Sequence, residues 1–400
     1  MGQGNNSIND RSEMPRCFVT RITSPQRGAV SVLSMAGPDA ARLVRHHFQS
    51  ATGKPLDQLR LNRIVFGRWR LLGGSCEEVV VCWRSEDEIE VSCHGGAAAS
   101  QAIMATLTAV GAVERSAAEW AQGRFAGTIE VDALLALTDA RTERVAAILL
   151  DQHRGALREA VQTVIEILQR GETCAAKVKL RQLCNRAQFG KHLIDPWRVV
   201  FAGPPNAGKS SLINRLLGYQ RAIVFDKPGT TRDLLSALAV FDGWPVELID
   251  SAGLRTSSNA IEREGVQRTE AMLDRADLTV LVFDATTAWD ADCRELTRGT
   301  CDPICVLNKQ DLPPGFICPH GFVATSAKTG HGLDPLMHRI VKRLIDVPYE
   351  PGDAVPFTTQ QIDAIARANN AVLRDRRDDA LAILTSLLTH NDKRCAARLA

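Results

Sequence analysis

The sequence lacks a hydrophobic run long enough to cross a membrane, a CxxC pair and a strong net charge. A membrane span needs about 20 consecutive apolar residues, so none is expected. The eleven cysteines are scattered and odd in number, which favours reduced thiols, and therefore a cytoplasmic protein, over a disulfide framework. The formal net charge of +2 gives no overall attraction for nucleic acid. Any contact with RNA must come from a local basic patch.

The first half of the chain changes texture twice. Residues 1–15 are polar without an apolar core, which predicts a disordered start and no signal peptide. Residues 16–116 mix short strand-like runs with helical runs between Gly and Pro, which predicts a small α/β domain. Residues 117–195 carry apolar residues at helical spacing, which predicts the first part of a helical domain.

The second half predicts a domain inserted into the helical one. In residues 196–345, apolar runs such as RVVFAG, LTVLVFD and PICVLNK alternate with helical stretches. Strands that are apolar throughout are typical of a doubly wound, mostly parallel sheet buried on both faces. Residues 346–400 contain a capping-box pattern, TTQQ, followed by two helical runs. We expect these helices to pack on those of residues 117–195, giving an α/β multidomain fold.

The stretch GPPNAGKSS, residues 203–211, has the spacing GxxxxGK[ST] between a predicted strand and a predicted helix. That is the context of a phosphate loop, in which backbone N–H groups and the positive end of the helix face a phosphate. Lys209 would span the β- and γ-phosphates, and the Ser210 hydroxyl would bind Mg²⁺. For this motif alone, a Gly-rich turn is the alternative.

Four further motifs follow in the order that a GTP site requires. GTTRD, residues 229–233, offers Thr231 to the metal, and DSAG places Asp250 near Mg²⁺ and the Gly253 N–H near the γ-phosphate. In NKQD, Asp311 can accept both the N1–H and the 2-amine of guanine, which adenine cannot supply. SAK, residues 326–328, would complete the base pocket, so GTP is the predicted substrate. The predicted nucleotide-binding residues are Gly203, Asn206, Ala207, Gly208, Lys209, Ser210, Ser211, Thr230, Thr231, Asp250, Gly253, Asn308, Lys309, Asp311, Ser326, Ala327 and Lys328.

A Ras-like enzyme places a glutamine directly after the DxxG glycine to orient the attacking water, but here that residue is Leu254. The set PNAGKSSL, GTTRD, DSAGLR with the downstream IEREG, and NKQD resembles the GTPase domain of the tRNA-modification GTPase family (MnmE, also called TrmE). RITSPQRGAVSVLSMAGPDAA resembles the N-terminal opening of that family, and EIEVSCHGG resembles its folate-domain motif.

The resemblance implies a potassium-stimulated GTPase that acts as a homodimer, with K⁺ in place of an arginine finger. By motif, Asn206 would donate a side-chain oxygen to K⁺, and Thr230 would lie in the loop that encloses the ion. Glu262 would orient the attacking water and, with Lys209, form the catalytic pair; a solvated glutamate at the start of a helix is the alternative for Glu262. Two residues of the enclosing loop depart from the family pattern, namely Phe225 and Lys227.

The tRNA chemistry of the family resembles a one-carbon transfer that uses a 5-formyltetrahydrofolate-type folate and a flavoprotein partner. Glu90 keeps its place before the HGG turn, where a carboxylate can hydrogen-bond the folate ring. Ser34 and Thr128, however, stand where the family has an arginine and a lysine, and Cys395 lacks the Gly-Lys of the Cys-x-Gly-Lys tail. Each lost charge-assisted contact costs about 1–3 kcal/mol, so we expect folate binding to be weakened.

Two functions stay open. The first is a cytoplasmic GTPase, dependent on Mg²⁺ and K⁺, that acts with a flavoprotein in carboxymethylaminomethyl-type modification of wobble uridine in tRNA. The second is a regulatory GTPase switch that has lost the folate and tRNA chemistry. A ribosome-assembly GTPase shares the GTP motifs, but the N-terminal opening argues against it. For tRNA, the basic run 170–191 is the candidate patch, with a solvated helix face as the alternative.

Overall fold

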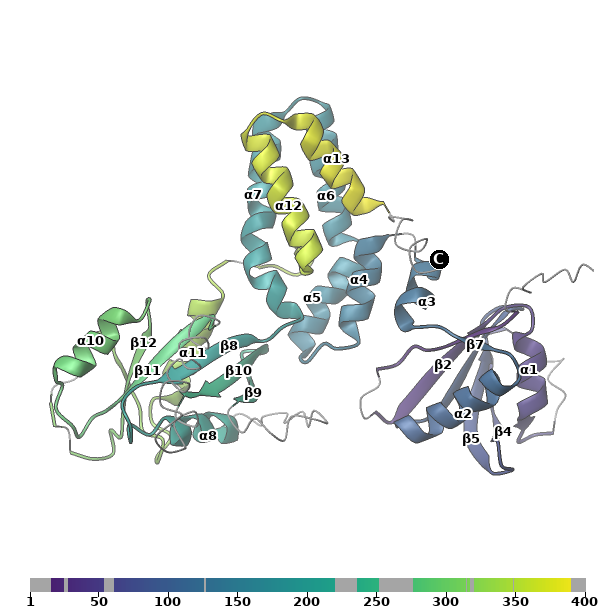
Figure 1. Cartoon of the computed structure of the whole chain (residues 1–400), viewed down its shortest axis with the longest axis horizontal. Coiled ribbons are helices and arrows are strands. Elements are labelled where there is room, and N and C mark those ends of the chain that lie inside the picture. The colour runs from purple at the N-terminus through teal and green to yellow at the C-terminus, as the bar shows by residue number, and fades with distance from the viewer. Residues whose placement is uncertain are drawn as a thin grey trace, which may run out of the picture. The chain divides into compact units, whose positions relative to one another are not determined.

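The chain forms two compact units, Met1–Ala126 and Gly127–Ala400, each with its own sheet (Figure 1). The predicted α/β multidomain architecture is confirmed. Among the described residues, no helix is both long and apolar enough to cross a membrane. The computed structural model describes residues 16–24, 28–53, 61–125, 127–219, 236–251, 276–313, 315–316, 320–347 and 349–389.

In the described part of the first unit, seven strands form one sheet in the order β3-β4-β5-β6-β2-β1-β7. All neighbours are antiparallel except β1 and β7. Alternate residues of β2 and β6, such as Leu33, Met35, Ile89 and Val91, point into one core, as expected for a sheet with one covered face. The elements are β1 (Phe18–Arg21), β2 (Val30–Ala36), α1 (Ala40–His47), β3 (Phe48–Ser50), β4 (Ile64–Arg70), β5 (Cys76–Trp83), β6 (Glu88–His94), α2 (Ala97–Ala109), β7 (Val113–Glu114) and α3 (Ala117–Arg124).

Helix α3 belongs to the first unit, although the sequence placed residues 117–124 in the helical domain. Ser116 and Glu119 form a capping box that begins the helix. The Trp120 Nε1 then donates a hydrogen bond of 3.1 Å to the hydroxyl of Ser34 on β2. The unit boundary at Ala126 therefore lies beyond the predicted bound at residue 116, because this long-range contact cannot be read from helical spacing.

The second unit contains a six-stranded sheet, counted over its described residues, in the order β13-β12-β11-β8-β10-β9. All pairs are parallel except β9 with β10. Val280 and Val282 of β11 join one core cluster, while Leu281 and Phe283 join a second cluster. The strand is thus buried on both faces, which confirms the doubly wound, mostly parallel sheet. The elements are β8 (Trp197–Ala202), α8 (Lys209–Tyr219), β9 (Ser236–Phe241), β10 (Trp244–Asp250), β11 (Leu278–Asp284), α10 (Ala291–Gly299), β12 (Ile304–Asn308), β13 (Val323–Ala324) and α11 (Leu333–Leu344).

The helices that precede this sheet segment in the sequence share one apolar core with the helices that follow it. Val161 of α6 and Leu180 of α7 cluster with Ile365 of α12 and Leu384 of α13. In Figure 1 the late helices α12 and α13 lie beside the earlier α6 and α7. The helical elements are α4 (Thr128–Leu137), α5 (Glu143–His153), α6 (Ala156–Gln169), α7 (Thr173–Gly190), η2 (Lys191–Leu193), α12 (Thr359–Leu373) and α13 (Arg377–Leu388).

A buried histidine, His192, lies where the helices lead into the first strand of the sheet. His192 of η2 stacks on Trp197 at the start of β8, with ring centroids 3.4 Å apart and planes inclined by 20°. The His192 Nε2 lies 3.5 Å from the Asp277 carboxylate, which also accepts a hydrogen bond of 2.9 Å from the Arg198 N–H. Asp277 precedes β11, so this contact joins the helical bundle to two strands of the sheet.

After the last helix of the sheet segment, the chain returns to the helices through residues 353–355, which form hydrogen bonds with Gln152 of α5. The amide of Gln152, which is fully buried, donates to the Asp353 carbonyl and accepts from the Val355 N–H, each at 3.0 Å. Arg186 of α7 forms an ion pair of 2.7 Å with the Asp353 carboxylate. Buried polar groups that are satisfied in this way fix one geometry. The sheet segment is therefore held to the helices at both of its ends.

Candidate nucleotide-binding site

The phosphate-loop motif lies between β8 and α8, as the sequence predicts. Gly203 has a φ of +138° and Gly208 a φ of +88°. A Cβ on Gly203 would lie 2.2 Å from the Val282 carbonyl oxygen, and one on Gly208 would lie 2.5 Å from the Asn308 side-chain nitrogen. Both positions therefore require glycine. The loop can approach β11 and β12 only because these side chains are missing.

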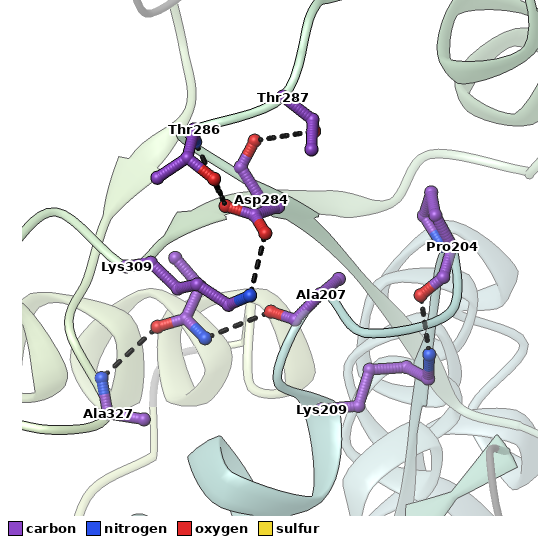
Figure 2. A network of polar contacts seen from close by, with 9 residues as sticks. Pro204, Ala207, Lys209, Asp284, Thr286, Thr287, Lys309 and Ala327 are labelled. Carbon is purple, nitrogen blue, oxygen red and sulfur yellow. Dashed lines mark hydrogen bonds and ion pairs between the residues drawn. The ribbon is translucent and has the colours of Figure 1, made fainter. Parts of the chain in front are cut away.

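Lys209 is folded back into the loop. Its ammonium donates hydrogen bonds to the carbonyl oxygens of Gly203 at 3.1 Å and Pro204 at 2.8 Å, the second of which Figure 2 shows. The residue is only 5% exposed. The positive charge is thus held where the predicted phosphates would enter, at the N-terminus of α8.

Ser210 and Asp250 meet at the same edge of the sheet. The Ser210 hydroxyl, in the first turn of α8, donates a hydrogen bond to the carboxylate of Asp250. Asp250 ends β10, and it lies opposite Phe201 in the parallel pairing with β8. A hydroxyl and a carboxylate are oxygen ligands of the kind that Mg²⁺ prefers, directly or through water. The residues fit the predicted Mg²⁺ site.

The residues predicted to read the base lie at the ends of β12 and β13. The Ser326 hydroxyl donates a hydrogen bond of 2.6 Å to the Asp311 carboxylate, and the Lys328 ammonium lies 4.0 Å from it. The bond from Ser326 lowers the pKa of Asp311, although desolvation opposes the change. Asp311 is therefore ionised at neutral pH, so its carboxylate can accept two N–H groups.

Asn308 connects the two halves of the site. It is 1% exposed, and its amide nitrogen donates to the Ala207 carbonyl at 3.0 Å. Its amide oxygen accepts a hydrogen bond of 3.1 Å from the Ala327 N–H. One side chain thus links the phosphate loop to the SAK segment. Sequence reasoning placed Asn308 in the site, and the structure gives it this bracing position.

One residue of this network was missed from the sequence. Asp284 ends β11, and its carboxylate accepts a hydrogen bond of 2.7 Å from the Lys309 ammonium (Figure 2). Its other oxygen accepts from the N–H and hydroxyl of Thr286 at 2.9 and 2.8 Å. The sequence did contain a signal for this residue. Asp284 ends the apolar run LTVLVFD in the same way that Asp250 ends the run PVELID.

Several predicted residues lie outside the described part of the chain. Two other predicted residues do lie inside it. Ser211 is exposed on α8, and Asn206 is exposed in the loop before α8, with a φ of +61°. The residues outside are Thr230, Thr231, Gly253 and Glu262 of the predicted site, together with Phe225, Lys227, Leu254 and Cys395.

The residues compared with a folate site already have partners within the chain. Glu90 is bound by the Arg84 guanidinium, at 2.8 Å from Nε and 2.7 Å from a terminal nitrogen. Ser34, opposite Glu90 in the β2–β6 pairing, accepts the bond from Trp120. In the other unit, the Thr128 hydroxyl donates to the Leu387 carbonyl at 2.8 Å. A carboxylate engaged by arginine and two neutral side chains do not fit an anionic folate.

Comparison with known proteins identifies the family. The model of the 50S ribosome-binding GTPase family matches residues 198–309. The tRNA modification GTPase MnmE of Symbiobacterium thermophilum is 30% identical over an alignment of 402 positions that covers 88% of this chain and 87% of that protein. The MnmE protein of Chloroflexus aurantiacus is 33% identical over an alignment of 368 positions that covers 81% of this chain and 80% of that protein. The solved G domain of the T. maritima FeoB iron transporter is 28% identical and covers 37% of this chain and 99% of its own, with a TM-score of 0.27. The coverage of nearly the whole length by the two MnmE proteins, together with the GTP motifs at the carboxyl edge of the sheet, shows that the chain belongs to the tRNA modification GTPase family MnmE.

Proposed function

We propose that the chain binds GTP at the edge where β8, β10 and β12 end, hydrolyses it with Mg²⁺, and uses this activity in tRNA modification in the cytoplasm. Membership of a GTPase family implies GTP and Mg²⁺. The contacts of Asn308 carry the proposal, because they join the phosphate-loop motif to the SAK segment, and the Ser326 hydroxyl of that segment holds the Asp311 carboxylate.

Each described side chain has a role that follows from its position. The Lys209 ammonium would neutralise charge on the β- and γ-phosphates, and Ser210 and Asp250 would hold Mg²⁺, which would neutralise further phosphate charge. Asp311 reads the guanine edge. Phosphoryl transfer needs positioning and charge stabilisation more than covalent chemistry, and these groups supply both. The remaining proposed contacts are Gly203, Asn206, Ala207, Gly208, Ser211, Thr230, Thr231, Gly253, Asn308, Lys309, Ser326, Ala327 and Lys328.

Hydrolysis also needs a group that orients water and a cation for the transition state. We assign the first to Glu262, and the second to K⁺ bound by Asn206 and Thr230. The exposed position of Asn206 in the loop supports this assignment, because its side-chain amide is not committed to the core. Since Leu254 follows the DSAG glycine, no glutamine stands at that position to orient the water.

GTP turnover is expected to be at least about tenfold faster in KCl than in NaCl of equal ionic strength, because a cation of the right size replaces an arginine finger. Asn206→Gly should remove the preference without strain at the positive φ, while Asn206→Asp should keep it because an oxygen remains. Steady-state phosphate release gives both rates. Equal turnover in the two salts, or a K⁺ preference that survives Asn206→Gly, would contradict the K⁺ assignment.

For tRNA, we propose a homodimer that acts with a flavoprotein partner on wobble uridine. Deleting the gene and digesting total tRNA to nucleosides should show loss of the carboxymethylaminomethyl-type uridine, and the wild-type gene should restore it. A variant with Asp311→Asn should fail to restore it, because guanine recognition is lost. Unchanged wobble uridine in the deletion strain would reject the tRNA role.

The second candidate is a regulatory GTPase switch without folate chemistry. The pairing of Glu90 with Arg84, and the neutral Ser34 and Thr128, favour this alternative. It shares the GTP site with the first candidate. The nucleoside digest separates the two, because a switch of this kind leaves wobble uridine unchanged.

A further inference from the structure

Asp284 lies inside the network of the nucleotide site but has no place in the GTP motifs. Its side chain is 12% exposed, and both of its carboxylate oxygens accept hydrogen bonds. One oxygen is committed to Thr286, within its own turn, while the other receives the Lys309 ammonium from the next strand end. Burial raises the pKa of Asp284, but the bonds from Lys309 and Thr286 outweigh it, so the pKa lies below its usual value. Asp284 is therefore ionised at neutral pH.

Lys309 lies between the phosphate loop and the base-reading turn. Its Cε is 3.9 Å from the position that a Cβ on Gly208 would take, so its alkyl chain passes over the loop. Its backbone φ is +67°, in the left-handed region, and its carbonyl accepts from the Leu312 N–H at 3.0 Å. That turn carries Asp311. The orientation of the Lys309 side chain therefore affects both ends of the ligand site.

Backbone contacts bring Asp284 and the NKQD turn together independently of the ion pair. The Ala285 N–H donates to the Asn308 carbonyl at 2.9 Å, next to the parallel pairing of Asp284 with Asn308. This register explains why the last residue of β11 can reach the residue after β12. The ion pair then fixes a side chain that is itself one-third exposed, at 33%, and would otherwise sample many rotamers.

We propose that Asp284 is a positioning residue for guanine nucleotide binding, which holds the Lys309 side chain as the wall between the phosphate loop and the base-reading turn. The inference rests on the proposed GTP site and extends it to a residue outside the motifs. Asp284 acts through Lys309 and does not itself touch the nucleotide.

The two sides of the Asp284 carboxylate can be tested separately. Asp284→Asn keeps an acceptor for Thr286 but removes the charge that holds Lys309. It should weaken GDP binding to the full-length protein with Mg²⁺ by about tenfold, since a charge-assisted hydrogen bond is lost. Thr286→Val removes only the hydroxyl bond, and as the matched control it should bind GDP within about twofold of wild type. Calorimetric titration with GDP gives each affinity.

Two further measurements distinguish positioning from a general loss of structure. In a Lys309→Met background, Asp284→Asn should cost at most about twofold, because the partner through which it acts is gone. Asp284→Asn should also weaken GDP and inosine diphosphate, which lacks the 2-amine, by the same factor, because Asp311 still reads the base. The thermal midpoint of the ligand-free variant should stay near that of wild type.

Three outcomes would overturn the inference. In the first, Asp284→Asn binds GDP as wild type does; in the second, its full cost persists without Lys309. In the third, it loses the discrimination between GDP and inosine diphosphate, as a collapsed base-reading turn would. These results leave the proposed function standing when the wild-type protein takes up GDP. If the wild-type protein itself takes up no guanine nucleotide, the proposed function fails and the inference fails with it.

Discussion

Asp311→Asn is expected to lower the affinity for GDP and GTP by about 10³- to 10⁴-fold, because a site built to pair with a polar edge discriminates by that factor once the pairing fails. The ionised carboxylate accepts two N–H groups of guanine, whereas an asparagine turns an NH₂ donor toward one of them. Ser326 can still donate to the amide oxygen, so the turn keeps its contact. Competition titrations with GDP and xanthosine diphosphate measure the change. Xanthine carries a 2-carbonyl, so the variant should gain affinity for it relative to guanine.

Lys328 provides the matched control for that variant. Its ammonium lies 4.0 Å from the Asp311 carboxylate, and its side chain is 81% exposed. An exposed pair of this length contributes little, and the proposed contact of the SAK segment with the base is made by its backbone, so Lys328→Ala should bind GDP within about threefold of wild type. If Asp311→Asn showed a similarly small loss, with no shift toward xanthine, guanine would not be read by this carboxylate.

Stability is expected to fall by up to about 3 kcal/mol as the pH drops from 6.5 to 4, through the single imidazole of His192. Burial lowers the pKa of His192 to about 4 from 6.5, and the neighbouring Asp277 only partly opposes this. Between these values the unfolded chain binds a proton that the folded chain does not. The stability that neutral His192 contributes is therefore complete above its pKa in the unfolded chain. It is lost as the pH falls toward its pKa in the folded chain.

The measurement compares wild type with His192→Asn by denaturant unfolding at about pH 7 and pH 4.5. Acidification affects other groups as well, so the prediction concerns the difference: the variant should lose about 2–3 kcal/mol less than wild type. The charged groups near the ring, Asp277, Lys191 and Asp195, are present in both proteins. His338→Asn, on the exposed side of α11, serves as the control and should lose as much as wild type. Equal losses in wild type and His192→Asn would show that the ring does not titrate in this way.

The arrangement of the proposed GTP site could be predicted because its groups lie within short motifs whose spacing fixes their geometry. A strand, a glycine turn and a helix place Lys209 and Ser210 without knowledge of any other strand. The ends of parallel strands meet at one edge, so Asp250 and Asp311 could be assigned to the same ligand. The sheet could be predicted for a similar reason, because runs apolar in every residue require cover on both faces.

The contacts that could not be predicted all depend on which elements become neighbours. The pairing of Asp284 with Lys309 needs β11 beside β12 in register, and strand order is not written in hydrophobic spacing. Trp120 reaches Ser34 across 86 positions of sequence, so the assignment of α3 to the first unit had no local signal. Arg84 and Glu90 are six positions apart, but only the turn between β5 and β6 brings them together. The comparison of Glu90 with a folate ligand therefore missed its partner.

The shared core of α6, α7, α12 and α13 has a consequence for biosynthesis. On the ribosome, α6 and α7 are complete at Gly190, but α12, which packs on α7, ends at Leu373, and α13, which packs on α6, is not finished until Leu388. At 5–20 residues per second, the interval is roughly 10–40 s, long enough for the intervening sheet to form first. During that time the apolar sides of α6 and α7 lack the cover that the late helices provide. The nascent chain must therefore carry an open half-bundle, which closes only after the intervening sheet segment has been made.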